Sequence, residues 1–170
     1  NFAAIFQKNI KRMLAYSSMS QLGYIVTAIA LMSHLGWVTA LYLTANHLMT
    51  KGILFLVAAA IIFRTGARTF ADLGGLARSM PLTFAAATIA IVAMSGLPPL
   101  AGFGGKWLLL SAMVEKGWYG PIVFGVLATF VGFLYMARFI QTIFLDTAKP
   151  ARLETSEAPP ALLVSQVLLI

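Results

Sequence analysis

The chain has 170 residues, of which 60% are hydrophobic and only 10% charged, and its mean hydropathy is +0.89. This composition excludes an ordinary soluble domain and predicts an all-α integral membrane protein in contact with the lipid bilayer. The absence of cysteine excludes disulfides and thiolate metal sites, and the net charge of +7 does not indicate nucleic-acid binding, because the basic residues lie at the ends of apolar segments.

Two complete membrane spans are predicted in the first third of the chain. The first covers about 13–34 and follows a basic collar at 8–12, and its length suits a hydrocarbon core of ~30 Å. Residues 34–37 predict the turn, with Trp37 at the membrane interface. The second span covers about 38–63, and a basic, glycine-containing loop at 64–78 follows it.

The segment 81–116 allows two interpretations, because two prolines and three glycines near 97–105 interrupt an apolar run. Residues 81–97 and 103–116 would be either a hairpin of two spans, each only about 21–26 Å long, or two half-helices of one broken crossing. The broken crossing places the basic collars at 8–12, 64–78 and 149–152 on one side, so the positive-inside rule favours it.

A further full span is predicted at about 121–145, followed by a polar loop and an apolar run at 161–170 that covers only half a bilayer, about 15 Å. The chain also opens with Asn1 rather than Met. We therefore expect one transmembrane domain that is part of a larger polytopic protein. The collars predict that it is a multi-pass protein of the cell inner membrane or the equivalent energy-coupling membrane.

His47 and Lys51 lie four residues apart near the centre of the second span, on the same helix face as Thr44. A lysine at mid-bilayer costs at least ~2.5–3.5 kcal/mol, so it is expected to face the protein interior. Lysine can release its proton where arginine does not, and histidine can relay one through its ring. The same residues would also make a structural polar clamp between helices.

Lys106 follows the predicted break directly. The negative end of the first half-helix favours its charged form, whereas the positive start of the second half-helix disfavours it. A small rearrangement would therefore change the protonation state of Lys106. The alternative is a lysine that extends to the far interface, but Lys106 lies ten residues, about 15 Å, from Lys116.

Four further polar residues are candidates for a proton pathway. Ser17, Gln21 and Tyr24 recur at near-helical spacing and would either hold waters or form hydrogen bonds between helices. Arg138 would be a structural cation or an electrostatic neighbour of the pathway.

Four segments resemble the antiporter-like subunits of respiratory complex I, of multisubunit Na+/H+ (Mrp) antiporters and of membrane-bound hydrogenases. Segment 9–23 (NIKRMLAYSSMSQLG) is similar to the entry into their tenth helix, and 46–56 (NHLMTKGILFL) to the eleventh. Segment 96–106 (GLPPLAGFGGK) resembles the discontinuous twelfth helix, and 134–139 (LYMARF) the thirteenth.

The resemblance implies a second inverted repeat of a subunit with about fourteen helices. It implies that His47 belongs to a central hydrophilic axis, that Lys51 matches a lysine of the eleventh helix, and that Lys106 is the terminal proton acceptor and donor. Some family members carry histidine where Gln21 stands, so the resemblance implies no histidine relay at that position. Gln21 and the segment 97–106 favour the Mrp-type D subunit or close complex I relatives.

We therefore expect a membrane subunit that conducts protons, or exchanges a cation such as Na+ for protons, by way of His47, Lys51 and Lys106. Its partners would be the other membrane subunits of a multisubunit complex. It would bind no flavin, iron–sulfur cluster or haem and catalyse no redox step itself, while NADH and quinone would react in the parent complex. The alternatives are a secondary transporter of small organic solutes and a passive membrane scaffold.

Overall fold

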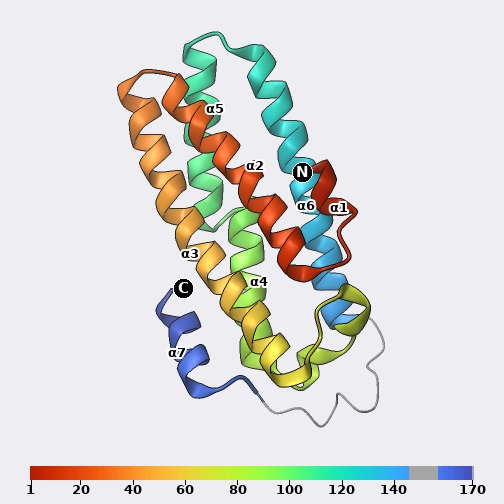
Figure 1. Ribbon diagram of the computed structural model, residues 1–170. Coiled ribbons are helices and arrows are strands. Elements are labelled where there is room, and N and C mark those ends of the chain that lie inside the picture. Colours follow the sequence, from red (N-terminus) through yellow and green to blue (C-terminus); the bar gives the residue numbers. More distant parts are fainter. Residues whose placement is uncertain (146–156, 170) are drawn as a thin grey trace.

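The computed structural model describes residues 1–145 and 157–169, and the regular elements in these ranges are all helices. Figure 1 shows a bundle in which α2, α3 and α6 run lengthwise, α4 and α5 lie end to end, and α7 packs beside α3. The elements are α1 (Phe2–Ile5), α2 (Ile10–Ala30), α3 (His34–Thr65), the 3₁₀ helices η1 (Phe70–Asp72) and η2 (Leu76–Arg78), α4 (Pro81–Ser95), α5 (Ala101–Glu115), α6 (Tyr119–Phe144) and α7 (Pro160–Leu168).

The turn between α2 and α3 lies three residues earlier than the sequence predicted. Helix α3 already begins at His34, because the Ser33 side chain caps it by accepting a hydrogen bond of 3.0 Å from the backbone N–H of Gly36. Met32 has a positive φ of 48° and reverses the chain. The predicted turn at 34–37 is therefore wrong, and Trp37 lies in the first turn of α3.

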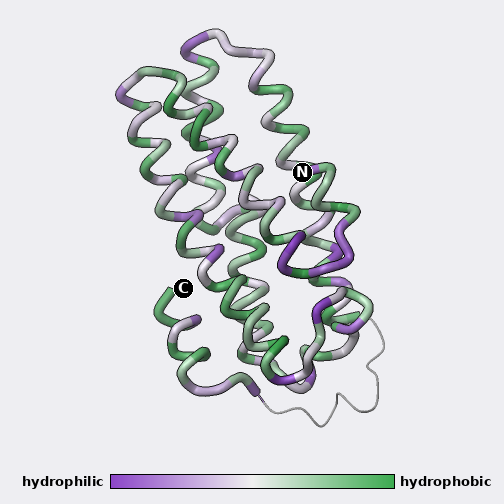
Figure 2. Tube along the Cα trace, viewed as in Figure 1, coloured by the Kyte–Doolittle hydropathy of each residue, from purple (hydrophilic) through white to green (hydrophobic). Residues whose placement is uncertain are grey.

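The outer surface of the bundle is apolar. By length and composition α3 and α6 are each able to cross a membrane, and α4 is a shorter apolar helix. Large side chains such as Leu41, Phe63 and Phe124 are at least 70% exposed. Figure 2 shows the hydrophilic residues mainly in the loops, with green helices between them. Such a surface suits hydrocarbon rather than water.

Helices α4 and α5 form one discontinuous helix. Helix α4 ends where Gly96 adopts a left-handed conformation with φ 78°, and α5 starts at Ala101. Figure 1 shows that the chain continues into α5 in the same direction, whereas a hairpin would have reversed it. The prolines and glycines break the helix without ending the crossing.

Two of the predicted basic collars lie at the same end of the bundle. The backbone N–H of Ile10 donates to Arg68 O at 3.1 Å, and the N–H of Phe70 donates to Lys8 O at 3.0 Å. The loop before α2 is therefore joined to the loop after α3, which places their basic residues together. The third collar, at 149–152, lies outside the described residues.

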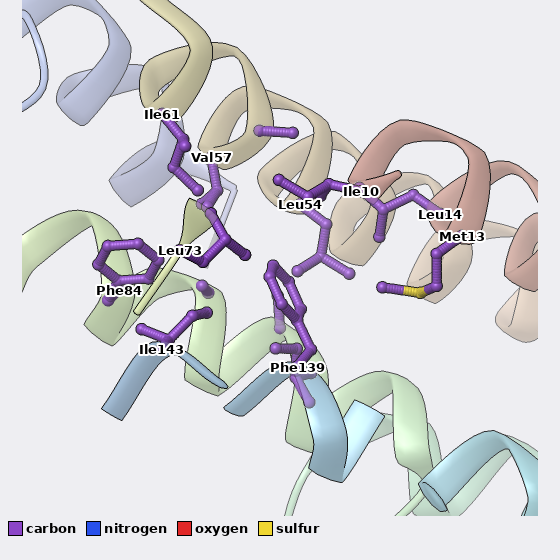
Figure 3. Close-up of a cluster of buried hydrophobic side chains, with 14 of the residues drawn as sticks. Ile10, Met13, Leu14, Leu54, Val57, Ile61, Leu73, Phe84, Phe139 and Ile143 are labelled. Atoms are coloured by element: carbon purple, nitrogen blue, oxygen red, sulfur yellow. The ribbon is translucent and has the colours of Figure 1, made fainter. Parts of the chain in front are cut away.

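The core is divided into two clusters along the bundle. The larger packs the start of α2 and the second half of α3 against α4, α6 and the η1–η2 loop. Figure 3 shows its centre, with Phe139 and Ile143 of α6 facing Leu54 and Val57 of α3. The smaller cluster packs the end of α2 and the start of α3 against α5. Helix α4 thus belongs to one cluster and α5 to the other, with the break between them.

The join between the half-helices depends on Gly102. A Cβ built at this position overlaps the backbone carbonyl oxygen of Ala93. A carbonyl inside a helix cannot move aside as a flexible side chain can, so only glycine allows α5 to approach α4 this closely.

We predict that Gly102→Ala destabilises the full-length protein by about 3 kcal/mol or more, because the added methyl forces the backbones apart. The measurement is thermal denaturation in detergent. Gly120→Ala is the control, since a Cβ there meets no atom within 4 Å. Equal melting temperatures for the two variants would contradict this account.

Glu157 caps the start of α4. Its carboxylate accepts hydrogen bonds from the backbone N–H of Leu82 at 2.9 Å and from the hydroxyl of Thr83 at 2.6 Å. Partial burial raises the pKa of Glu157. The hydrogen bonds from Thr83, Ala158 and Leu82 together lower it by more than burial raises it, so the net pKa lies below the usual value of 4.5. The ionised carboxylate therefore ties the segment before α7 to α4.

This cap predicts a pH dependence. Because the folded pKa of Glu157 is below its unfolded value, its stabilising effect is fully present above the ordinary glutamate range and disappears as the pH falls through the folded pKa. We expect hydrogen exchange of α7 amides, corrected for the intrinsic pH effect, to lose protection in acid. In Glu157→Gln the protection should be low at neutral pH already, and an unchanged profile in this variant would refute the cap.

Candidate functional site

A layer of polar side chains crosses the bundle at the level of the helix break, between the two apolar clusters. Helix α2 contributes residues 17–24, α3 contributes 44–51, and the junction of α4 and α5 contributes 95–106. The apolar clusters lie on either side of these positions on each helix. Polar groups enclosed in this way must find partners within the protein.

Lys106 binds the open end of α4. Its Nζ donates to the backbone carbonyls of Ser95 at 2.8 Å and Met94 at 3.2 Å. These are carbonyls of the last helical turn, which have no partner within the helix and carry its negative partial charge. The ammonium also lies 5.6 Å from the centre of the Tyr24 ring. No carboxylate pairs with Lys106 in the described part of the chain.

Gly96 makes room for the Lys106 side chain. A Cβ at Gly96 would lie 2.6 Å from Lys106 Cδ and 2.9 Å from Nζ. Since Gly96 also has a positive φ, glycine is required there for two reasons. The residue that ends α4 therefore also seats the lysine from α5.

Lys51 joins α3 to α2. Its Nζ donates to Leu14 O at 2.8 Å and forms a short hydrogen bond with Ser17 Oγ. Lys51 is 6% exposed and Ser17 is fully buried. The predicted polar face of α2 thus meets the predicted face of α3 through this pair.

His47 lies one turn before Lys51 on α3 and is partly buried. Its Nδ1 is buried and has no hydrogen-bond partner among the described residues. Thr44, which shares this face, donates its hydroxyl proton to Ala40 O of its own helix at 2.7 Å. Of these three residues, only Lys51 is bonded to another helix in the described structure.

Two cavities border Lys106. The larger, about 440 Å³, lies between α5 and α6 and is almost entirely apolar. The smaller, about 10 Å³, lies between α2 and α6 and is lined by polar groups that include Gln21, Tyr24 and Tyr135. Its size approaches the minimum for one water molecule. The predicted residues Gln21, Tyr24 and Lys106 therefore surround one small polar space.

Arg138 lies elsewhere. Its guanidinium donates to Ile5 O at 2.9 Å and stacks over the Phe70 ring at 5.3 Å. It does not line either cavity beside Lys106. In the described structure it ties α6 to α1 and η1 at the basic end of the bundle.

Tyr135 is one of the polar residues of this site that sequence reasoning missed. It is 4% exposed, lines the small polar cavity and donates a hydrogen bond of 3.2 Å to Asn1 Oδ1. Its segment 134–139 was noted as a motif, but the hydroxyl alone gave no signal, because a tyrosine in a membrane helix commonly sits at the interface.

Several known proteins are similar to this chain. The NADH-quinone oxidoreductase subunit N of Desulforudis audaxviator is 38% identical over 142 residues, which cover 84% of this chain and 28% of that protein. A chain in the structure of the membrane-bound sulfane sulfur reductase, an archaeal respiratory membrane complex, is 37% identical with a TM-score of 0.90. That match covers 98% of this chain and 28% of the other.

A chain in the Mrp complex from Dietzia sp. DQ12-45-1b is 30% identical with a TM-score of 0.83, and the match covers 86% of this chain and 28% of that one. The present chain thus spans less than a third of the length of these relatives. The family model described as "NADH:quinone oxidoreductase/Mrp antiporter, TM" matches residues 1–132. This chain therefore belongs to the NADH:quinone oxidoreductase/Mrp antiporter transmembrane family.

Proposed function

We propose that the chain is part of a proton-translocating membrane subunit of a respiratory NADH-quinone oxidoreductase or an Mrp-type antiporter complex. In this proposal Lys51 and Lys106, together with His47, hold protons on their way through the bundle. The main support is the position of Lys106, an amine bound to the free carbonyls of a broken helix with no carboxylate partner among the described residues.

The chemistry of the site suits a proton better than a metal ion. An amine binds and releases H+ without a change in coordination, and the backbone carbonyls stabilise its charged form. Loss of the proton leaves two N–H donors but removes the positive charge that those carbonyls stabilise, so the charge of Lys106 is coupled to the geometry of the break. A buried second lysine, Lys51, lies in the same polar layer.

The parent complex supplies the driving reaction in this proposal. In the oxidoreductase case NADH and quinone react in other subunits, and in the antiporter case Na+ is the second transported ion. The partners are further membrane subunits, and the location is the cell inner membrane or the equivalent energy-coupling membrane. The similarity to subunit N and to the Mrp complex favours this function over transport of an organic solute.

We predict that Lys106→Ala lowers proton transport on the order of a hundredfold, the scale of losing a positioned proton-transfer group. The assay uses the full-length subunit in its assembled complex, reconstituted in liposomes with an internal pH indicator. Transport is driven by NADH and quinone or by an imposed Na+ gradient. Loss is expected because alanine leaves nothing at the break that can carry the proton.

Lys116→Ala is the matched control, because it removes an exposed lysine at the end of the same helix. Its transport should equal that of the wild type. If Lys106→Ala assembled and transported protons normally, with or without a lower melting temperature, Lys106 would be a structural clamp and the proposed role would be wrong.

A further inference from the structure

The predicted route leaves a gap between the two lysines. Lys51 is bonded to α2, and Lys106 is bonded to the end of α4. His47 does not bridge them in the described structure, since its buried Nδ1 has no hydrogen-bond partner there. A proton that passes from one amine to the other therefore needs further groups.

Helix α6 supplies such a group in Tyr135. The Ser17 side chain, which is bonded to Lys51, also lies within reach of the Tyr135 hydroxyl. Tyr135 in turn lines the small polar cavity that Lys106 borders from its other side. These groups therefore lie in the order Lys51, Ser17, Tyr135, cavity, Lys106.

We propose that Tyr135 is a proton-relay residue, which joins Lys51 to Lys106 through Ser17 on one side and a single water in the small cavity on the other. This inference rests on the proposed function. It differs from the predicted route because the connection between the lysines passes through hydroxyl groups of α2 and α6 and not through His47.

The relay balances for one proton. Ser17 Oγ takes a proton from the Lys51 ammonium and passes its own to the Tyr135 oxygen, and Tyr135 passes its phenolic proton to the water. The water gives a proton to the neutral amine of Lys106. At each oxygen one O–H bond forms as another breaks, so the net result is a neutral Lys51 and a charged Lys106. Rotation of the hydroxyls then resets the chain.

In the resting structure the relay is interrupted at both hydroxyls. The Ser17 hydroxyl donates to Leu14 O at 2.9 Å, and the Tyr135 hydroxyl donates to Asn1 Oδ1 at 3.2 Å. Both hydroxyl protons therefore point away from the route, and both must rotate before transfer. Since each alternative acceptor lies within the same cluster, a rotation exchanges one hydrogen bond for another.

The test compares proton transport by the full-length subunit in its reconstituted complex. Tyr135→Phe removes the hydroxyl and keeps the ring, so transport should fall on the order of a hundredfold. Ser17→Ala should cause a similar loss, and the double variant should be no worse than either single one, because all three interrupt the same chain. Tyr119→Phe, at an exposed tyrosine of α6, is the control and should transport as the wild type.

Two results would overturn the relay. One is transport by Tyr135→Phe within twofold of the wild type while Lys106→Ala is inactive. This result would refute the relay and leave the proposed function in place. The other is a double variant whose loss is the product of the two single losses, which indicates independent structural damage. Failure of the proposed function itself is recognised separately, by normal transport in Lys106→Ala.

Discussion

The contact between the Lys106 ammonium and the last carbonyls of α4 is the interaction on which the rest of the structure depends. A helix that stops inside a membrane exposes carbonyls with no partner, and a lysine at the same depth exposes donors with no partner. Each defect is costly alone, and each satisfies the other at Met94 and Ser95. The break and the lysine are therefore one feature.

The position of Lys106 within α5 also matters. It is the sixth residue of that helix. The positive end of the helix dipole acts most strongly in the first turn, and Lys106 lies beyond that turn. Its Nζ meanwhile reaches back to the negative end of α4. The lysine thus belongs to α5 by its backbone and to α4 by its charge, and any shift between the half-helices changes the stability of the proton it carries.

The division of the core explains how such a shift would be accommodated. Helix α4 packs in the larger apolar cluster and α5 in the smaller one, so each half-helix is held by its own neighbours. The polar layer between the clusters is bound by hydrogen bonds to individual side chains and not by close apolar packing. Ser17 and Lys51 tie α2 to α3 across this layer, while Gly102 keeps the two half-helices in backbone contact.

Composition and residue order by themselves determined the membrane class, the break after α4 and the presence of His47, Lys51 and Lys106 in apolar helices. Proline, glycine and charge act locally, so their effects can be deduced from sequence. The turn at Met32 and Ser33 was missed because it depends on a cap and a positive φ, which the apolar pattern does not reveal.

Only the tertiary structure decided which polar groups meet. Ser17 and Lys51 are 34 residues apart, and Tyr135 comes from a third helix. Helical spacing indicates which face a residue occupies but not which face of another helix lies opposite. That pairing is set by how α2, α3 and α6 pack together, and the same packing places Arg138 over Phe70 and away from the polar layer.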